Sequence, residues 1–332
     1  GKIVSPMGCR AFLSPWYEKG GMKPADENDV PVFVGRFNIG AVSLHLPMIL
    51  AKAQQENKPF FDVLDYYLNL IRQLHLRTYD YLGEMRASTN PLAYCEGGFL
   101  GGHLKLTDKI KPLLKSATAS FGITALNELQ ELYNGKSLVE DGAFAVEVLE
   151  HINQKISEYK EEDGNLYAIY GTPAETLCYR FARIDREKYG DISNVTDKGY
   201  YTNSYHVDVR EKIDAFTKFK IESEFQNKSL GGAISYVEVP NLTNNVEAIE
   251  EVIRFIYDNI QYGEFNTKSD YCQVCGYDGE IMINDNMEWE CPQCHNKDHA
   301  KMNVTRRTCG YLGENFWNAG KTKEIKARVL HL

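Results

Sequence analysis

Apolar residues recur at three- and four-residue intervals in several segments of the chain, and this spacing predicts amphipathic helices. The clearest segment is 60–83, where FFDVLDYYLNLIRQLHLRTYDYLG keeps the pattern over its whole length. The same periodicity predicts helices over 122–134, 142–160 and 246–261.

Short runs rich in β-branched and aromatic residues lie between the helical segments and predict strands. These runs are VPVFVGRFNIGAV at 30–42, GNLYAIYG at 164–171 and AISYVEV at 233–239. Helices that alternate with isolated strands favour an α/β architecture with a mainly parallel sheet or barrel.

Composition and charge narrow the choice of partners. The chain has 332 residues, of which 43% are hydrophobic, so a sizeable core is available. Its formal net charge of −9 argues against a nucleic-acid partner, because binding to phosphate backbones needs a basic surface. It lacks a run of roughly 18 apolar residues and a signal-peptide pattern, so we expect a cytoplasmic protein with no membrane partner. Because the first residue is Gly1 rather than Met, we also expect a fragment or a processed chain.

The cysteines gather near the carboxyl end of the chain. Cys272 and Cys275 form one C-x-x-C pair, Cys291 and Cys294 form a second, and fifteen residues separate the pairs. This spacing is typical of a zinc site, because each pair places two thiolates on one side of a tight turn. Four sulfurs fill the coordination shell, so we predict a structural zinc ion rather than a catalytic one.

The segment that follows these cysteines, VTRRTCGYLG at 304–313, contains the string R-x-C-G-Y-L-G. It resembles the glycyl-radical loop of the anaerobic, class III ribonucleoside-triphosphate reductases, and the resemblance places Gly310 at the radical position. Glycine suits this role because it has no Cβ, so a planar Cα radical is unhindered and the backbone is free to adopt unusual angles. The same family places two C-x-x-C pairs just upstream of the loop.

Near the start of the chain, MGCRAFL at 7–13 resembles the segment that carries the transient thiyl radical of this family. The match assigns that role to Cys9, on a finger loop that faces the glycine inside a barrel. Cys95 and Cys178 lie among apolar residues, and we predict that they are buried packing residues.

Two further segments resemble substrate-binding parts of the family. GRFNIG at 35–40 resembles a strand that presents an asparagine, so Asn38 is a candidate for contact with substrate hydroxyls. An ordinary asparagine at the end of a strand is the other interpretation of Asn38.

YGTPAE at 170–175 predicts the start of a helix, with Thr172 as the N-cap and Pro173 as the first helical residue. The resemblance implies that substrate phosphates bind at this helix N-terminus, where Tyr170, Thr172 and Ala174 are candidate contacts. A plain capped helix is the other interpretation of this segment.

The resemblance implies a ten-stranded α/β barrel with a finger loop, of which this chain supplies the carboxy-terminal half. We therefore expect half of the catalytic barrel over 1–266, a four-cysteine zinc module over 267–300, and the radical loop and tail over 301–332. The missing amino-terminal half would carry allosteric sites for dATP and ATP.

The resemblance also implies the reaction and its partners. An activase that uses S-adenosylmethionine and an iron–sulfur cluster would install the radical on Gly310, and the radical would then oxidise Cys9. The substrate would be a ribonucleoside triphosphate, reduced to the 2′-deoxyribonucleotide with formate or a thioredoxin-like reductant. A homodimer is the expected assembly.

Two other interpretations remain open. Formate acetyltransferase-like and dehydratase-like enzymes also carry a glycyl radical, on a related R-V-x-G-Y/W loop, but without the two C-x-x-C pairs. A zinc-ribbon protein that binds a partner without catalysis is the non-enzymatic interpretation.

Overall fold

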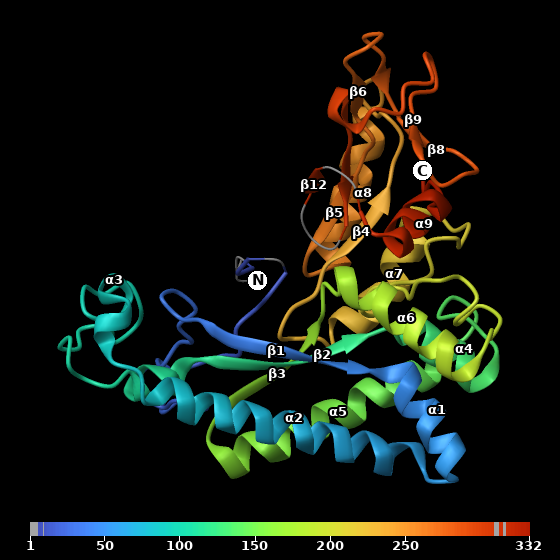
Figure 1. The fold of residues 1–332 in the computed structure, drawn as a ribbon. Helices are drawn as coiled ribbons and strands as arrows, with labels where there is room; N and C mark the ends of the chain where they lie inside the picture. The colour runs from blue at the N-terminus through green and yellow to red at the C-terminus, as the bar shows by residue number, and fades with distance from the viewer. Residues whose placement is uncertain (1–5, 9, 309–311, 315–316) are drawn as a thin grey trace.

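A computed structural model of the chain describes residues 6–8, 10–308, 312–314 and 317–332. Its centre is a parallel sheet in which β2 (Thr118–Thr124) lies between β1 (Asn38–His45) and β3 (Leu166–Gly171) (Figure 1). Every residue of β2 is buried. The strand is therefore covered on both faces along its whole length.

Two further strands form a separate small sheet. β4 (Ser235–Glu238) and β5 (Gly263–Asn266) pair in parallel with each other. Just before β4, the backbone N–H of Gly231 donates a hydrogen bond to the carbonyl of Ile169 on β3, at 2.7 Å. The described strands thus confirm the predicted α/β class with a parallel sheet, whereas the ten-stranded barrel remains a prediction.

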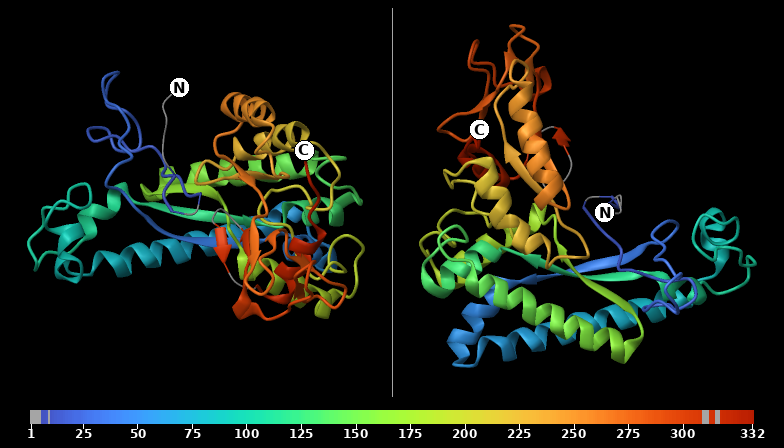
Figure 2. Two further views of the ribbon diagram at one scale, coloured as in Figure 1. Left: turned by 90° about the horizontal axis from the view of Figure 1, so that it is seen from above. Right: turned by 180° about the vertical axis from the view of Figure 1, so that it is seen from behind.

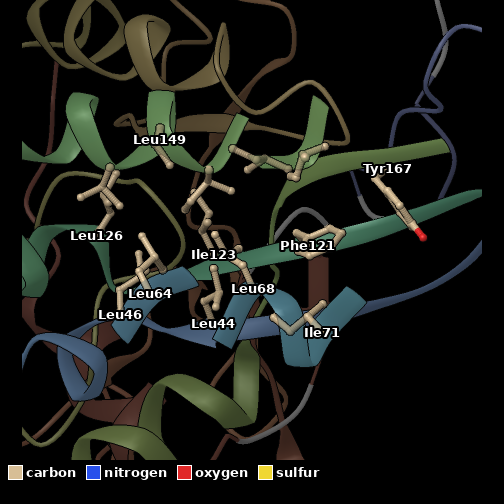
Figure 3. Close-up of a cluster of buried hydrophobic side chains, with 14 of the residues drawn as sticks. Leu44, Leu46, Leu64, Leu68, Ile71, Phe121, Ile123, Leu126, Leu149 and Tyr167 are labelled. Atoms are coloured by element: carbon tan, nitrogen blue, oxygen red, sulfur yellow. The ribbon is translucent and has the colours of Figure 1, made fainter. Parts of the chain in front are cut away.

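Two long helices cover one face of the central sheet (Figures 1 and 2). They are α2 (Phe60–Gly83) and α5 (Ala143–Asp163), and the Arg72 guanidinium of α2 binds the Asp163 carboxylate of α5 at 2.6 Å. Figure 3 shows apolar side chains from α2, α5 and the sheet meeting in one core. Its labelled members are Leu44, Leu46, Leu64, Leu68, Ile71, Phe121, Ile123, Leu126, Leu149 and Tyr167.

Shorter helices connect the strands and surround the sheet. Their local signals include Asp214, whose carboxylate caps α7 by accepting the N–H of Thr217 at 3.0 Å, and Asn245, which caps α8. The helices are α1 (Leu46–Glu56), α3 (Pro91–Tyr94), α4 (Leu126–Asn134), α6 (Glu175–Tyr189), α7 (Ala215–Gln226) and α8 (Val246–Asn259), with single 3-10 turns at η1 (Ala87–Thr89) and η2 (Lys111–Ser116).

The carboxy-terminal residues form small antiparallel sheets beside β4, β5 and α8 (Figure 1). One has the order β10-β6-β7, and the pairs β8–β9 and β11–β12 form two more. Their apolar residues, together with Ile325 from α9, make a separate core around Trp289. The elements are β6 (Asp270–Cys272), β7 (Asp278–Gly279), β8 (Met282–Ile283), β9 (Trp289–Glu290), η3 (His299–Lys301), β10 (Met302–Asn303), β11 (Thr305–Arg307), β12 (Leu312–Glu314) and α9 (Ala319–Ala327).

Most of the predicted elements are confirmed. The helices predicted over 60–83, 142–160 and 246–261 correspond to α2, α5 and α8, and the strands predicted over 164–171 and 233–239 correspond to β3 and β4.

Two predicted elements are wrong in part. In the segment 122–134, the first residues belong to β2 and helix α4 begins only at Leu126. The apolar residues Ile123, Leu126 and Leu129 recur at three-residue intervals across this boundary, so the helical pattern extends into the end of the strand. In the segment 30–42, β1 begins at Asn38, since Pro31 has no N–H to donate and the Val34 side chain is 85% exposed.

None of the helices in the described ranges combines the length and apolar character required to cross a bilayer.

The packing of α2 on the sheet predicts a difference between two leucines of the same helix. Leu68 is fully buried in the core, whereas Leu70 is 40% exposed. We expect Leu68→Ala to lower the free energy of unfolding by about 3 kcal/mol, because it leaves a cavity. Leu70→Ala should change it by less than about 0.5 kcal/mol. Urea-induced unfolding measures both values, and equal losses would contradict this packing.

Candidate functional site

The four predicted cysteine ligands lie together. All of their sulfur atoms are within 4.8 Å of one another, and the Sγ atoms of Cys272 and Cys294 are 3.7 Å apart, as are those of Cys275 and Cys291. A tetrahedron with metal–sulfur bonds of about 2.3 Å has edges of about 3.8 Å. The four thiols therefore have the spacing of a tetrahedral metal site.

The two C-x-x-C pairs form equivalent turns. In each turn, the residue after the second cysteine has a left-handed backbone, with φ of +76° at Gly276 and +60° at His295. Its N–H donates to the carbonyl of the first cysteine, at 2.9 Å for Gly276 and 3.0 Å for His295. Glycine adopts this conformation without strain, and His295 is a less common choice. The imidazole of His295 binds the Glu290 carboxylate at 2.6 Å and is not part of the four-sulfur group.

The surroundings of Cys272 and Cys294 shift the pKa values of these two thiols in opposite directions. Burial disfavours ionisation of Cys272, but backbone N–H groups of Cys275 and Val274 and the neighbouring thiols lower its pKa to about 6. The N–H of Asn296 favours the Cys294 thiolate, but burial and the surrounding sulfurs raise the pKa of Cys294 to about 12. Four thiolates this close repel one another, and a bound divalent cation offsets that repulsion.

In the sequence, the predicted radical position falls between two strands that pair with each other. β11 and β12 are antiparallel, with Arg307 opposite Leu312, so residues 308–311 join them. Thr308 is 1% exposed. Gly310 lies outside the described residues.

Cys9 also lies outside the described residues, whereas residues 6–8 and 10–12 on either side of it are described. The N–H of Met7 donates to the carbonyl of Ala11 at 2.6 Å, and the N–H of Phe12 donates to Gly231 at 3.0 Å. These bonds hold Met7, Ala11 and Phe12 beside the residues that join β3 to β4.

Arg10 anchors the same segment from within the protein. It is fully buried, and one guanidinium nitrogen donates to the carbonyl of Gly171 and to the hydroxyl of Ser204, both at 3.4 Å. A Cβ at Gly232 would lie 2.6 Å from the carbonyl oxygen of Arg10, so the close approach requires glycine there. Sequence reasoning assigned no role to Arg10, because a single arginine after a cysteine gives no sign of burial.

Asn38 opens β1, and its side-chain amide is held in one orientation. Its Nδ2 donates to the Ser120 hydroxyl at 2.7 Å, while its Oδ1 accepts the N–H of Gly40 at 2.7 Å. A register shift between Asn38 and Gly40 accompanies this arrangement. The residue is half-buried.

The structure contradicts the predicted cap at the start of helix α6. Thr172 stays with the sheet, because its N–H donates to Ile123 at 3.3 Å and its hydroxyl meets the Ser43 hydroxyl at 2.8 Å. The prediction of Thr172 as N-cap is therefore wrong. Helix α6 begins at Glu175, not at Pro173, and its N-cap residue is Ala174, at φ +46°, whose side chain cannot accept a hydrogen bond. Tyr170, the last of the three candidates, is a buried residue of β3.

One face of β2 brings several of these residues together. Thr118, Ser120 and Gly122 alternate with core residues and so share a face, the one opposite the core of α2 and α5. The Thr118 hydroxyl accepts the N–H of Ser14, on the segment that follows Cys9, at 3.2 Å. Ser120 holds Asn38, and a Cβ at Gly122 would lie 2.2 Å from Thr172 Oγ1. The surroundings of Cys9, Asn38 and Thr172 thus meet on one strand face.

The segment at 201–206, to which sequence reasoning assigned no role, contacts the residues that lead into α6. Asn203 donates its side-chain amide to the carbonyl of Pro173 at 2.8 Å and so holds the chain that enters α6. Burial lowers the pKa of His206 to about 4, so its imidazole is neutral near pH 7. Nothing in the sequence indicates this burial, because threonine, asparagine and serine side chains are mostly exposed in proteins.

Of the two cysteines predicted to pack in the core, Cys178 is buried and Cys95 is half-buried. Burial raises the pKa of the Cys178 thiol to about 12, and its S–H points to the carbonyl of Thr202 at 3.8 Å. The packing prediction is confirmed for Cys178.

The fold and the four-sulfur site together define an α/β protein with a four-cysteine module near its carboxyl end that could hold a metal ion. A sequence model of the family described as anaerobic ribonucleoside-triphosphate reductase matches residues 1–331. The chain therefore belongs to that family.

Individual relatives agree with this assignment. The anaerobic ribonucleoside-triphosphate reductase of Salmonella typhimurium is 36% identical over 341 residues, which cover 100% of this chain and 46% of the relative. The enzyme of the same name from Enterobacteria phage T4 is 37% identical over 99% of this chain and 53% of its own length. The chain thus spans about half the length of the curated relatives it matches.

Solved structures share the fold. One, titled anaerobic ribonucleotide reductase, has a TM-score of 0.64 at 20% identity and covers 87% of this chain and 44% of its own. The Thermotoga maritima anaerobic ribonucleotide reductase in complex with dATP and CTP has a TM-score of 0.61 at 20% identity, over 88% of this chain and 46% of its own.

The close contact at Gly122 predicts that this position does not tolerate a side chain. A methyl group there would lie 2.2 Å from Thr172 Oγ1 and 2.6 Å from Ser43 Oγ, so Gly122→Ala must displace both hydroxyls. We expect a loss of about 1–3 kcal/mol in the free energy of unfolding. Gly83→Ala is the control, because its new methyl group would meet only the flexible Lys111 side chain, at 3.3 Å. Thermal unfolding compares the variants, and a neutral Gly122→Ala would refute the contact.

Proposed function

We propose that this chain carries the radical-bearing half of an anaerobic ribonucleotide reductase, which reduces ribonucleoside triphosphates to 2′-deoxyribonucleoside triphosphates. The observation that carries the proposal is the face of β2 on which the surroundings of Cys9, Asn38 and Thr172 meet. Family membership favours this function over the two alternatives, another glycyl-radical enzyme and a non-catalytic zinc-ribbon protein.

Asn38 would contact the ribose hydroxyls. A side-chain amide has two N–H donors and an oxygen with two lone pairs. Ser120 and the N–H of Gly40 use one donor and one lone pair. One N–H and one lone pair therefore remain for a hydroxyl that both donates and accepts, and the two existing bonds hold the amide in place for it.

The phosphates would bind at the start of α6, near Tyr170, Thr172 and Ala174. The N-cap residue, Ala174, has no side-chain acceptor for the first N–H groups of this helix, so these groups and the positive end of the helix dipole are suited to an anion. Thr172 lies across Gly122 from Ser43. Ser120 and Gly122 are two residues apart on β2, so the ribose and phosphate contacts lie along one strand.

Gly310 and Cys9 would carry the radical. An activase with S-adenosylmethionine and an iron–sulfur cluster removes a hydrogen atom from Gly310, and the glycyl radical takes the hydrogen atom of the Cys9 S–H group. The Cys9 thiyl then abstracts the 3′-hydrogen of the ribose, the 2′-hydroxyl leaves as water, and Cys9 returns the hydrogen atom. Formate or a thioredoxin-like protein supplies the two electrons of the reduction.

Zinc is the metal that the four thiols fit best. The sulfur spacing suits a tetrahedral Zn²⁺ ion, and the complete shell leaves no position for substrate, so the ion would be structural. We divide the chain accordingly into half of the catalytic barrel at 1–266, the zinc module at 267–300, and the radical loop and tail at 301–332.

The remaining barrel strands and the allosteric sites for dATP and ATP would come from a partner half. The curated relatives are about twice as long as this chain, and one solved relative is titled with dATP bound in the specificity site. A homodimer of the complete reductase is the proposed assembly.

The zinc assignment predicts a metal content that depends on the four thiols. The purified protein should contain about one zinc ion per chain, and Cys291→Ser should lose most of it because a hydroxyl is a poor zinc ligand. Cys95→Ser, a cysteine outside the cluster, should keep the full content. Elemental analysis measures both, and equal zinc in the two variants would contradict the assignment.

The two radical residues predict separable defects. In the complete reductase, activated without oxygen, Cys9→Ser should make no deoxyribonucleotide, because it has no thiol to become a thiyl. It should still store the radical, so air should cleave its backbone at Gly310 and release the short tail. Cys95→Ser should do both, as the unaltered enzyme does.

Chromatography of the products and mass spectrometry of the chain provide the two readouts. Deoxyribonucleotide formation by Cys9→Ser would overturn the role of Cys9. A cleavable, activated enzyme that makes no deoxyribonucleotide would point to another glycyl-radical reaction.

A further inference from the structure

β11 presents two successive arginines to opposite sides. Successive side chains on a strand alternate between its faces, so Arg306 and Arg307 diverge. Arg306 enters the zinc module and is 1% exposed. Arg307 turns to β5, where it pairs with Glu264, and its N–H donates to Asn266 at 3.4 Å. β11 is thus held between the zinc module and β5.

Inside the zinc module, Arg306 meets a single carboxylate. Its Nη1 and Nη2 atoms bind the two oxygens of Asp270 at 2.5 and 2.7 Å, and both residues are buried. Nη2 also donates to the carbonyl of Ile281 at 3.1 Å. Asp270 accepts the N–H groups of Ile281 at 2.8 Å and Thr305 at 3.2 Å. Such a bidentate pair fixes geometry as well as charge.

Asp270 is tied directly to the metal site. It opens β6, and Cys272, two residues later, closes the same strand. The carboxylate that binds Arg306 thus lies on the same strand as a candidate metal ligand.

The strand β12, which pairs with β11, is held by the same module. The ring of Trp289 on β9 lies 5.3 Å from the Arg306 guanidinium and 5.6 Å from the ring of Trp317. Trp317 in turn packs on β12, where a Cβ at Gly313 would lie 3.2 Å from its Nε1 atom. Trp289 thus contacts both strands of this pair: it contacts β11 directly at Arg306, and it contacts β12 by way of Trp317.

We propose that Asp270 is a positioning residue that, through Arg306, sets the register of β11, the strand that precedes Gly310, and so supports radical formation there. A slip of one residue would exchange the two faces of β11, which would bring Arg307 to Asp270 and leave Arg306 without its carboxylate. A buried arginine without a partner is strongly unfavourable, so the pair holds one register. This inference rests on the proposed function.

The test compares the complete reductase with three variants. Asp270→Asn keeps the size of the side chain but removes its charge, and Arg306→Lys keeps the charge but loses the bidentate fork. Glu280→Gln is the matched control, because Glu280 is a 47% exposed carboxylate of the same module, paired with Lys268 at 2.6 Å. After anaerobic activation, radicals per chain are counted by electron paramagnetic resonance and zinc by elemental analysis.

We expect Asp270→Asn and Arg306→Lys to keep the zinc content of the unaltered enzyme, because all four thiols remain. Their radical yield should fall roughly tenfold, because Gly310 is no longer held in place for hydrogen abstraction. Glu280→Gln should match the unaltered enzyme in both measurements.

Two results would overturn the inference. One is an unchanged radical yield in the zinc-loaded Asp270→Asn enzyme. The other is parallel loss of zinc and radical in both variants, since the pair would then serve the metal site and not the hairpin. If Asp270→Asn does not fold, Arg306→Lys decides between these outcomes. Absence of a radical in the unaltered, zinc-loaded enzyme would instead refute the proposed function.

Discussion

Burial of β2 on both faces is the constraint on which the rest of the structure depends. One face carries Phe121 and Ile123, which pack into the core under α2 and α5. The other face carries small polar residues and a glycine, and these leave room for side chains from elsewhere in the chain. A strand with a large residue at Gly122 would fill that space. The same strand therefore stabilises the fold and shapes the candidate site.

The second constraint lies at the carboxyl end, where short strands have little apolar area of their own. The four thiols bring two turns together, and Trp289 forms the centre of a small core around them. Asp270 and Arg306 then join this module to β11 through a buried ion pair. A structural metal site can in this way act on a distant backbone position, because strands transmit register along their length.

The candidate metal-binding cysteines were easier to predict from the sequence than the boundaries of strands and helices. The four cysteines could be found from spacing alone, because metal coordination imposes a fixed pattern on the chain. Strand β2 was missed, because Ile123 near its end continues the three-residue spacing of Leu126 and Leu129, the apolar residues that open α4. The cap at Thr172 was wrong, because the Ser43 hydroxyl, 129 positions away, engages the Thr172 side chain. Arg10 and Asp270 went unnoticed, because their partners are distant in sequence.

The central claim is that Gly310 stores a radical, and electron paramagnetic resonance tests it most directly. The complete, zinc-loaded reductase, activated without oxygen, should give a doublet, because the single α-hydrogen of a glycyl radical splits its signal. Protein grown with glycine deuterated at Cα should give a narrow singlet, and Gly310→Ala should give no signal. A doublet that persists in the deuterated protein or in Gly310→Ala would contradict the account.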